Sequence, residues 1–239
     1  MIKTLPLLLS ALGLAGTAGA AMPANAPAHP APAHAPVVVE LFQSQGCSSC
    51  PPAQDNLNAI ADRPDVLALS FGVTYWDYLG WKDSFASPRF TARQWDYAHR
   101  NGRNNVATPQ IWINGRSTIV GSNRTELDAS IAQVAALRGP VMKIAGNRVQ
   151  IDAGQAPAGG ADIWLVRYDP RTVQVAIRAG ENGGRTLPHR DVVREMTRIG
   201  RWTGASQSLP IPKPADPAFR TAVLLQTGTG GPILGAAKG

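Results

Sequence analysis

The sequence has only two cysteines among its 239 residues, Cys47 and Cys50, and they lie three positions apart. Two cysteines cannot form the several bridges on which small secreted disulfide scaffolds depend, and they cannot supply all four ligands of a cysteine-only zinc site. Both classes are therefore excluded. Chemistry that uses one neighbouring pair of thiols remains open.

Charged and aromatic residues are also scarce, at 16% and 6% of the chain, whereas the hydrophobic share of 44% is ordinary for a globular protein. The composition therefore argues against a chain that is disordered throughout. The net charge of +7 is concentrated in residues 139–239, where 13 basic side chains outnumber 7 acidic ones. We interpret them as scattered solubilising residues rather than as a surface for an anionic partner. No motif of nucleic-acid binding occurs.

Long apolar segments are absent except near the N-terminus. There, Lys3 precedes the apolar run 5–14, and Ala18-Gly19-Ala20 offers small residues to a signal peptidase. This pattern predicts a signal peptide over residues 1–21, followed by an Ala/Pro-rich linker over residues 22–36. Because the apolar run is shorter than the roughly 20 residues of a transmembrane helix, we expect a periplasmic or secreted protein without a membrane span.

The residues around the cysteines predict a strand–helix–strand unit. Residues 37–42 are β-branched and apolar, which is typical of a buried strand, and residues 66–73 predict a second one. A helix is expected after Cys50, ending before Pro64. The two cysteines therefore fall at the start of this helix.

That position gives the pair a chemical interpretation. The positive end of a helix stabilises an anion, so it lowers the pKa of a thiol beside it, and the thiolate is the reactive form. We expect Cys47, which precedes the helix, to be the solvent-reachable attacking thiol, and Cys50 to be the less exposed resolving thiol. An inert disulfide clip and two ligands of a metal site are the alternatives that the sequence leaves open.

Two further segments in this half of the chain predict parts of a site near the cysteines. Residues 74–83 contain four of the ten Trp and Tyr residues. They predict either a groove for a peptide or apolar substrate or a loop held over the core by its aromatics. The groove residues would be Tyr75, Trp76, Asp77, Tyr78 and Trp81.

The other segment places Thr108-Pro109 before an apolar strand, and Asn114-Gly115 then predicts a hairpin turn. Helices are expected over residues 88–101 and 125–137.

Residues 139–239 predict short strands, whereas the first half predicts both strands and helices. A hairpin is predicted from 141–144 and 148–151, and four more short strands are expected at 163–168, 173–177, 222–226 and 232–236. These predict a small antiparallel β domain packed on the first. Residues 180–195 are too polar for a core, and they form either a loop ordered by its own ion pairs or a site facing the cysteines. The candidates in such a site are Glu181, Asn182, His189 and Arg194.

Cys47-Ser48-Ser49-Cys50 after a strand, together with Thr108-Pro109 before a hairpin strand, resembles the thioredoxin fold. More narrowly, the chain from residue 37 to its end resembles a bacterial family of secreted thioredoxin-like proteins of unknown function. The segments that carry this resemblance are residues 39–52, 75–83 and 108–110.

The resemblance implies a cis peptide bond at Thr108-Pro109, beside the cysteine pair, where the backbone would hold an extended substrate. It also implies that Glu40 replaces the buried carboxylate that serves as proton acceptor, although Glu40 lies one residue farther from Cys47 than is usual.

The sequence thus predicts an α/β protein, with a thioredoxin-like domain over residues 37–138 followed by an antiparallel β domain. The expected activity is thiol–disulfide exchange by Cys47 and Cys50 on a protein or small thiol or disulfide. It needs no cofactor, but it does need a redox partner, unidentified here, that resets the pair. One alternative is a copper chaperone that uses the two cysteines with His99 or His189. The other is a non-catalytic binding module with an inert bridge.

Overall fold

The computed structural model describes residues 1–2 and 35–239. The predicted signal peptide beyond its first two residues, and the linker up to residue 34, lie outside the described residues. Residues 35–239 belong to one compact unit, which is built on an eight-stranded mixed sheet. In spatial order its strands are β13 (Ile233–Lys238), β12 (Arg220–Gln226), β7 (Ala161–Asp169), β10 (Val192–Trp202), β2 (Val66–Gly72), β1 (Val37–Gln43), β3 (Gln110–Ile113) and β4 (Ser117–Ile119).

The predicted strand–helix–strand unit is confirmed. β1 and β2 pair in parallel, and α1 (Pro51–Ile60) is the helix between them. Two prolines open α1, where a missing backbone N–H removes no helical hydrogen bond. The predicted hairpin is present as well, because β3 pairs antiparallel with both β1 and β4.

The two other predicted helices are also present. α2 (Pro88–Arg100) begins at Ser87, whose side chain accepts a hydrogen bond from the Arg89 amide. α3 (Arg124–Gln133) begins at Asn123, which caps it in the same way, and it ends four residues earlier than expected.

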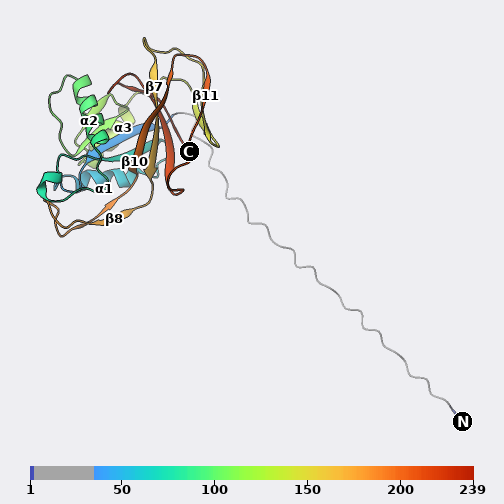
Figure 1. Ribbon diagram of the computed structural model, residues 1–239, viewed down its shortest axis with the longest axis horizontal. Helices are drawn as coiled ribbons and strands as arrows, with labels where there is room; N and C mark the ends of the chain where they lie inside the picture. Colours follow the sequence, from blue (N-terminus) through green and yellow to red (C-terminus); the bar gives the residue numbers. More distant parts are fainter. Residues whose placement is uncertain (3–34) are drawn as a thin grey trace. The chain divides into compact units, whose positions relative to one another are not determined.

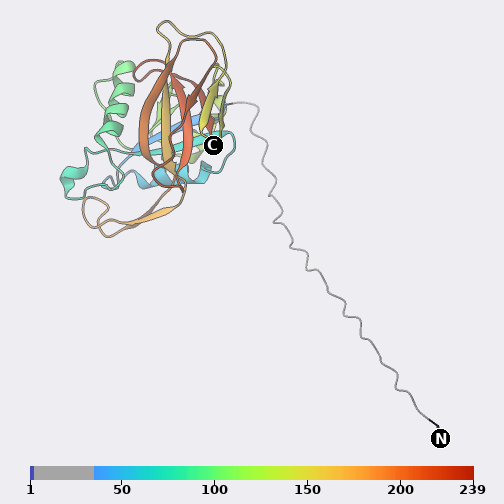
Figure 2. The ribbon, with the colours of Figure 1, turned by 45° about the vertical axis from the view of Figure 1, so that its right-hand side comes forward.

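The C-terminal half does not form the separate small β domain that its strand pattern predicted. Val192 of β10 pairs in parallel with Ser70 of β2, so β10, β7, β12 and β13 extend the first sheet (Figure 2). The physical reason is visible in β12, where alternate residues are buried in two different cores. A sheet with one solvent-facing side would leave half of these side chains exposed.

Two smaller β structures complete the fold. β5 (Met142–Ala145), β6 (Arg148–Ile151) and β11 (Gln207–Pro210) form a three-stranded sheet, and β8 (Val173–Ala176) pairs with β9 (Thr186–His189) as a hairpin. This hairpin lies beside α1 (Figure 1).

The large sheet is covered on both faces. Phe90 and Tyr97 of α2 pack on one face, in a core that reaches from β1 to β13. Leu57 of α1 and Leu127 of α3 pack on the other face of the N-terminal strands. Within the described ranges, no helix is both long enough and apolar enough to cross a membrane.

Candidate functional site

Cys47 and Cys50 form a disulfide at the N-terminus of α1, with their Cα atoms 5.5 Å apart. The Cys50 carbonyl accepts the first hydrogen bonds of the helix, from the amides of Ala53 and Gln54. The cysteine pair therefore lies where the sequence predicted it, at the positive end of the helix.

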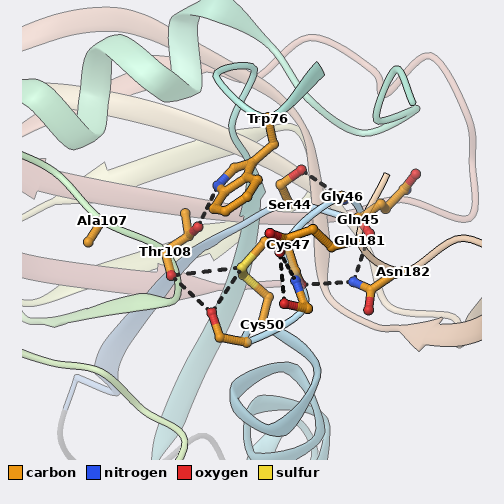
Figure 3. The surroundings of a disulfide bond; sticks show 12 residues. Ser44, Gln45, Gly46, Cys47, Cys50, Trp76, Ala107, Thr108, Glu181 and Asn182 are labelled. Carbon is orange, nitrogen blue, oxygen red and sulfur yellow. Dashed lines mark hydrogen bonds between the residues drawn. A yellow bond between two sulfur atoms is a disulfide. The ribbon is translucent and has the colours of Figure 1, made fainter. Parts of the chain in front are cut away.

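The exposure expected for Cys47 needs correction. Its exposed fraction is 0%, and that of Cys50 is 2%, whereas Ser48 and Ser49 between them are exposed. The expectation rested on the position of Cys47 outside the helix, which says nothing about distant segments that fold over it. Two such segments flank the disulfide from opposite sides (Figure 3).

The first segment is residues 180–185, between β8 and β9, which we call the capping loop. Asn182 is wholly buried and donates hydrogen bonds from Nδ2 to the carbonyls of Gln45 at 2.9 Å and Cys47 at 2.8 Å. Oε2 of Glu181 accepts hydrogen bonds from the Ser48 amide at 2.9 Å and the Ser48 hydroxyl at 2.7 Å. These two bonds lower the pKa of Glu181. The capping loop is thus attached to the backbone that carries Cys47.

The backbone of the capping loop favours a glycine at position 180. Its φ is +74°, which a side chain disfavours, and a Cβ atom there would lie 3.5 Å from the Cα of Gly46. Two glycines therefore face each other where the capping loop meets the cysteine loop.

The second segment contains Thr108-Pro109, whose peptide bond is cis, as the resemblance implied. The Thr108 carbonyl oxygen lies 3.8 Å from Sγ of Cys47 and accepts a hydrogen bond from the Ser49 hydroxyl at 3.4 Å. The indole N–H of Trp76 donates to the Thr108 hydroxyl at 2.7 Å (Figure 3). Backbone carbonyl and sulfur are therefore neighbours.

The aromatic segment is only partly gathered at the site. Trp81 donates its indole N–H to Oε1 of Gln45 at 2.9 Å. Trp76 and Trp81 therefore both donate hydrogen bonds to residues next to the disulfide, Thr108 and Gln45. Tyr75 donates its hydroxyl to Gln94, and burial raises its pKa to about 12. Tyr78 is 79% exposed and points to solvent. Three of the predicted groove residues thus hold their loop in place by hydrogen bonds, whereas the side chain of Tyr78 is exposed to solvent.

The sequence reading missed Asp83, which ends the same segment. Its buried carboxylate accepts hydrogen bonds from the amides of Gln45 and Phe85, each at 2.8 Å. Burial raises the pKa of Asp83 to about 6. Its only signal in the sequence is a single acid at the end of an aromatic-rich run.

Asp77, the remaining groove candidate, also acts within this segment. Its carboxylate accepts a hydrogen bond from the Asp83 amide.

The structure does not bring Glu40 to the cysteines. On β1, Val39 and Leu41 pack towards α1, whereas Glu40 alternates with them and lies on the α2 face. It is 0% exposed, and its carboxylate accepts hydrogen bonds from Arg93 at 2.8 Å and from the Tyr97 hydroxyl. The proton-acceptor role implied by the resemblance therefore has no geometric support, because both oxygens are engaged across the sheet.

His189 and Arg194 lie together at Phe85, whereas His99 lies elsewhere, on α2. His189 is 2% exposed and contacts the edge of the Phe85 ring, while the Arg194 guanidinium lies 5.0 Å from the centre of the same ring. His99 is exposed on α2, next to Trp95. Among the residues that the structure describes, no three His, Cys, Asp or Glu side chains come together as metal ligands, so the copper set is not assembled.

Comparison with known proteins gives a family match and two structural matches. The model of a family described as "Protein of unknown function (DUF1223)" matches residues 38–226. An X-ray structure of a protein from Agrobacterium tumefaciens is 35% identical, with a TM-score of 0.69 over 86% of this chain and 94% of that one. HBP35 of Porphyromonas gingivalis is 12% identical, with a TM-score of 0.53 over 86% of this chain and 75% of that one, which indicates a shared fold alone. No curated protein matches.

Proposed function

The chain belongs to the DUF1223 family of proteins of unknown function, and on that premise we propose that it is an exported thiol–disulfide oxidoreductase of the thioredoxin type. The observation that carries the proposal is the arrangement around Cys47. Its disulfide with Cys50 lies at the N-terminus of α1, and the Thr108 carbonyl lies 3.8 Å from its sulfur.

The order of strands around this site supports the thioredoxin assignment. The sequence β2-β1-β3-β4 combines one parallel pair with an antiparallel hairpin, with α1 and α3 on one face and α2 on the other. Of the strands that follow in the chain, β7, β10, β12 and β13 extend one edge of this unit.

The chemistry follows from the oxidised pair. A substrate thiolate attacks Sγ of Cys47, the bond between the two cysteines breaks, and Cys50 leaves as a thiolate that takes up a proton. A second substrate thiol then releases Cys47, so the substrate is oxidised to a disulfide and the protein pair is reduced. The helix N-terminus stabilises the anionic form of Cys47 when the second step releases it. The same steps run in reverse with a substrate disulfide.

This reaction requires a segment that covers Cys47 to move, because Cys47 is closed to solvent, and we propose that the capping loop is that segment. A substrate sulfur must approach along the line of the disulfide, and the loop residues Glu181 and Asn182 are bonded to the cysteine loop. The two neutral hydrogen bonds of Asn182 account for about 1–3 kcal/mol of this closure.

The burial of Cys47 also favours a second function, that of a non-catalytic binding module with a permanently closed bridge. In that case the capping loop would be part of the fixed core, and the exposed surface alone would carry the function. The two functions differ in whether the bridge exchanges with thiols in the native protein.

A redox titration separates them. The mature protein is equilibrated in a glutathione or dithiothreitol series, and free thiols are trapped with an alkylating reagent that shifts the protein on a gel. We expect a midpoint between about −270 and −120 mV, the range of known exchange proteins. A pair that stays oxidised well below about −300 mV would instead identify a structural bridge.

Export is tested separately, by determining the N-terminus of the protein isolated from the producing cells. Cleavage near Ala20 is the expected result.

A further inference from the structure

A small cavity lies beside Cys50, between the start of α1 and the end of β9. It offers about 10 Å³ of space to the centre of a water molecule, which is about the room that one buried water needs. Cys50, Gln43 and His189 all contribute to its wall. β9 follows the capping loop in the chain and contributes Leu187, Pro188 and His189 to the cavity wall.

Three buried polar atoms of this wall have no hydrogen-bond partner among residues 35–239. They are Nε2 of Gln43 and both ring nitrogens of His189. The exposed fractions of the two side chains are 1% and 2%. Buried polar atoms are rarely left unpaired. A single water in the cavity has the donors and acceptors to pair with the Gln43 amide and one imidazole nitrogen.

The surroundings of His189 keep its ring neutral. Burial lowers its pKa to about 4, so near pH 7 one ring nitrogen has a free lone pair. The edge of the Phe85 ring packs on it. Among charged groups, Asp55 lines the same cavity, the Arg194 guanidinium lies over the Phe85 ring, and Arg190 and Asp191 follow His189 in the chain. None of them donates a hydrogen bond to the imidazole.

Resting on the oxidoreductase function, we propose that His189 is the proton acceptor for the resolving thiol Cys50, through one water molecule in this cavity. In the resolving step, Cys50 Sγ forms a bond to Cys47 Sγ while the bond from Cys47 to the substrate sulfur breaks. The substrate sulfur leaves with the electron pair as a thiolate. The Cys50 proton passes to the water, whose own proton passes to the imidazole, and the departing thiolate finally takes up a proton.

The need for such an acceptor follows from burial. Cys50 is nearly closed to solvent, so hydroxide and buffer do not reach its proton. A thiol with an ordinary pKa of about 8.5 is only about 3% ionised at pH 7, and burial among apolar groups lowers that share further. A base at the cavity wall therefore accelerates resolution by at least about tenfold. Glu40 cannot take this role, since it lies across the sheet.

The test follows the two steps separately. Reduced protein is mixed in a stopped-flow instrument with an aromatic disulfide that releases a coloured thiolate. The first equivalent reports attack by Cys47, and the second reports resolution by Cys50. For His189→Gln we expect an unchanged first phase and a second phase slowed at least about tenfold at pH 7. The second phase of the variant should rise with pH up to the thiol pKa, whereas that of the native protein stays flat between about pH 6 and 8.

The remaining outcomes overturn the inference in distinguishable ways. An unchanged second phase in His189→Gln refutes the role of His189 and leaves the oxidoreductase function standing. Equal slowing of both phases shows a purely structural role, which also refutes it. If the native reduced protein releases neither equivalent, the oxidoreductase function itself fails, and the inference with it. His189→Asn serves as a second variant, and His99→Gln, exposed on α2, is the matched control.

Discussion

Asn182→Ala is the substitution that most directly tests whether the capping loop controls the disulfide. The change removes both hydrogen bonds that Nδ2 donates to the carbonyls of Gln45 and Cys47. Each neutral hydrogen bond contributes about 0.5–1.5 kcal/mol net, so the closed state loses about 1–3 kcal/mol relative to the open one. The open population should therefore rise by a factor of about 5 to 150.

The rate at which dithiothreitol reduces the native disulfide measures this population. When the loop opens and closes faster than the thiol attacks, the observed rate is the intrinsic rate multiplied by the open fraction. Reduction of the Asn182→Ala protein should thus be about 5- to 150-fold faster than that of the native protein, at equal reductant concentration. Asn147→Ala, an exposed asparagine between β5 and β6, is the matched control and should reduce at the native rate.

A second measurement separates loop opening from general destabilisation. Urea unfolding gives the global free energy of unfolding of each variant. The rate of disulfide reduction at urea concentrations where the protein is still folded reports the local opening of the loop. If the folded Asn182→Ala protein is reduced no faster than the native one, the capping loop does not limit access to Cys47. The burial of this cysteine would then have to arise from the Thr108 side alone.

Three further predictions concern buried charges. In Asp83→Asn, stability should fall more steeply on acidification than in the native protein, by about 3 kcal/mol between pH 6 and 4. The reason is that burial raises the folded pKa of Asp83 to about 6. The contribution of Asp83 to the free energy of unfolding is therefore largest at low pH and is lost as the pH rises through 6. His189→Gln should show the opposite trend, because the folded pKa of His189 is lowered to about 4 and its contribution is lost as the pH falls from 6.5 to 4, again by about 3 kcal/mol. Glu40→Gln should destabilise the fold by about 3–5 kcal/mol, since Arg93 remains buried without its counter-charge, while the redox midpoint stays unchanged.

Urea unfolding at a series of pH values checks the first two of these predictions, and unfolding combined with the redox titration checks the third. If the free energy of unfolding depends on pH in the same way in the native protein and in the Asp83 and His189 variants, burial does not shift the pKa values of these two groups as stated. A shifted redox midpoint in Glu40→Gln would show that this carboxylate acts on the cysteines across the sheet, contrary to its placement on the α2 face.

Much of the site's framework was predictable from short stretches of sequence. The apolar run before the cysteines, the prolines after them and the second apolar run predicted the strand–helix–strand unit that the structure contains. Each of these signals acts over a few residues, through steric preference and hydrogen bonding of the local backbone. Thr108-Pro109 was recognised from its resemblance to a known fold, and its cis peptide bond is present.

The chemistry around the sulfur atoms was much less predictable. The sequence predicts Glu181 and Asn182 as candidates for a site that faces the cysteines, but nothing in their segment indicates which groups they bond. It predicts no proton-acceptor role for His189, because that role depends on a cavity whose other walls come from β1 and α1. No pattern in the sequence indicates Asp83 as a site residue.

The sequence by itself determined the position of the cysteine pair at a helix start, and with it the class of reaction to consider, because those signals are local. The tertiary structure alone decided which groups surround the sulfur atoms. Pairing of β10 with β2 at Val192 and Ser70 sets the β8–β9 hairpin beside α1. Asn182 of the capping loop thereby contacts Cys47, which lies 135 residues earlier in the chain. The face of β1 on which α1 packs likewise places Glu40 with Arg93 rather than with the cysteines. Such long-range contacts depend on how whole layers pack, and no local pattern encodes that choice.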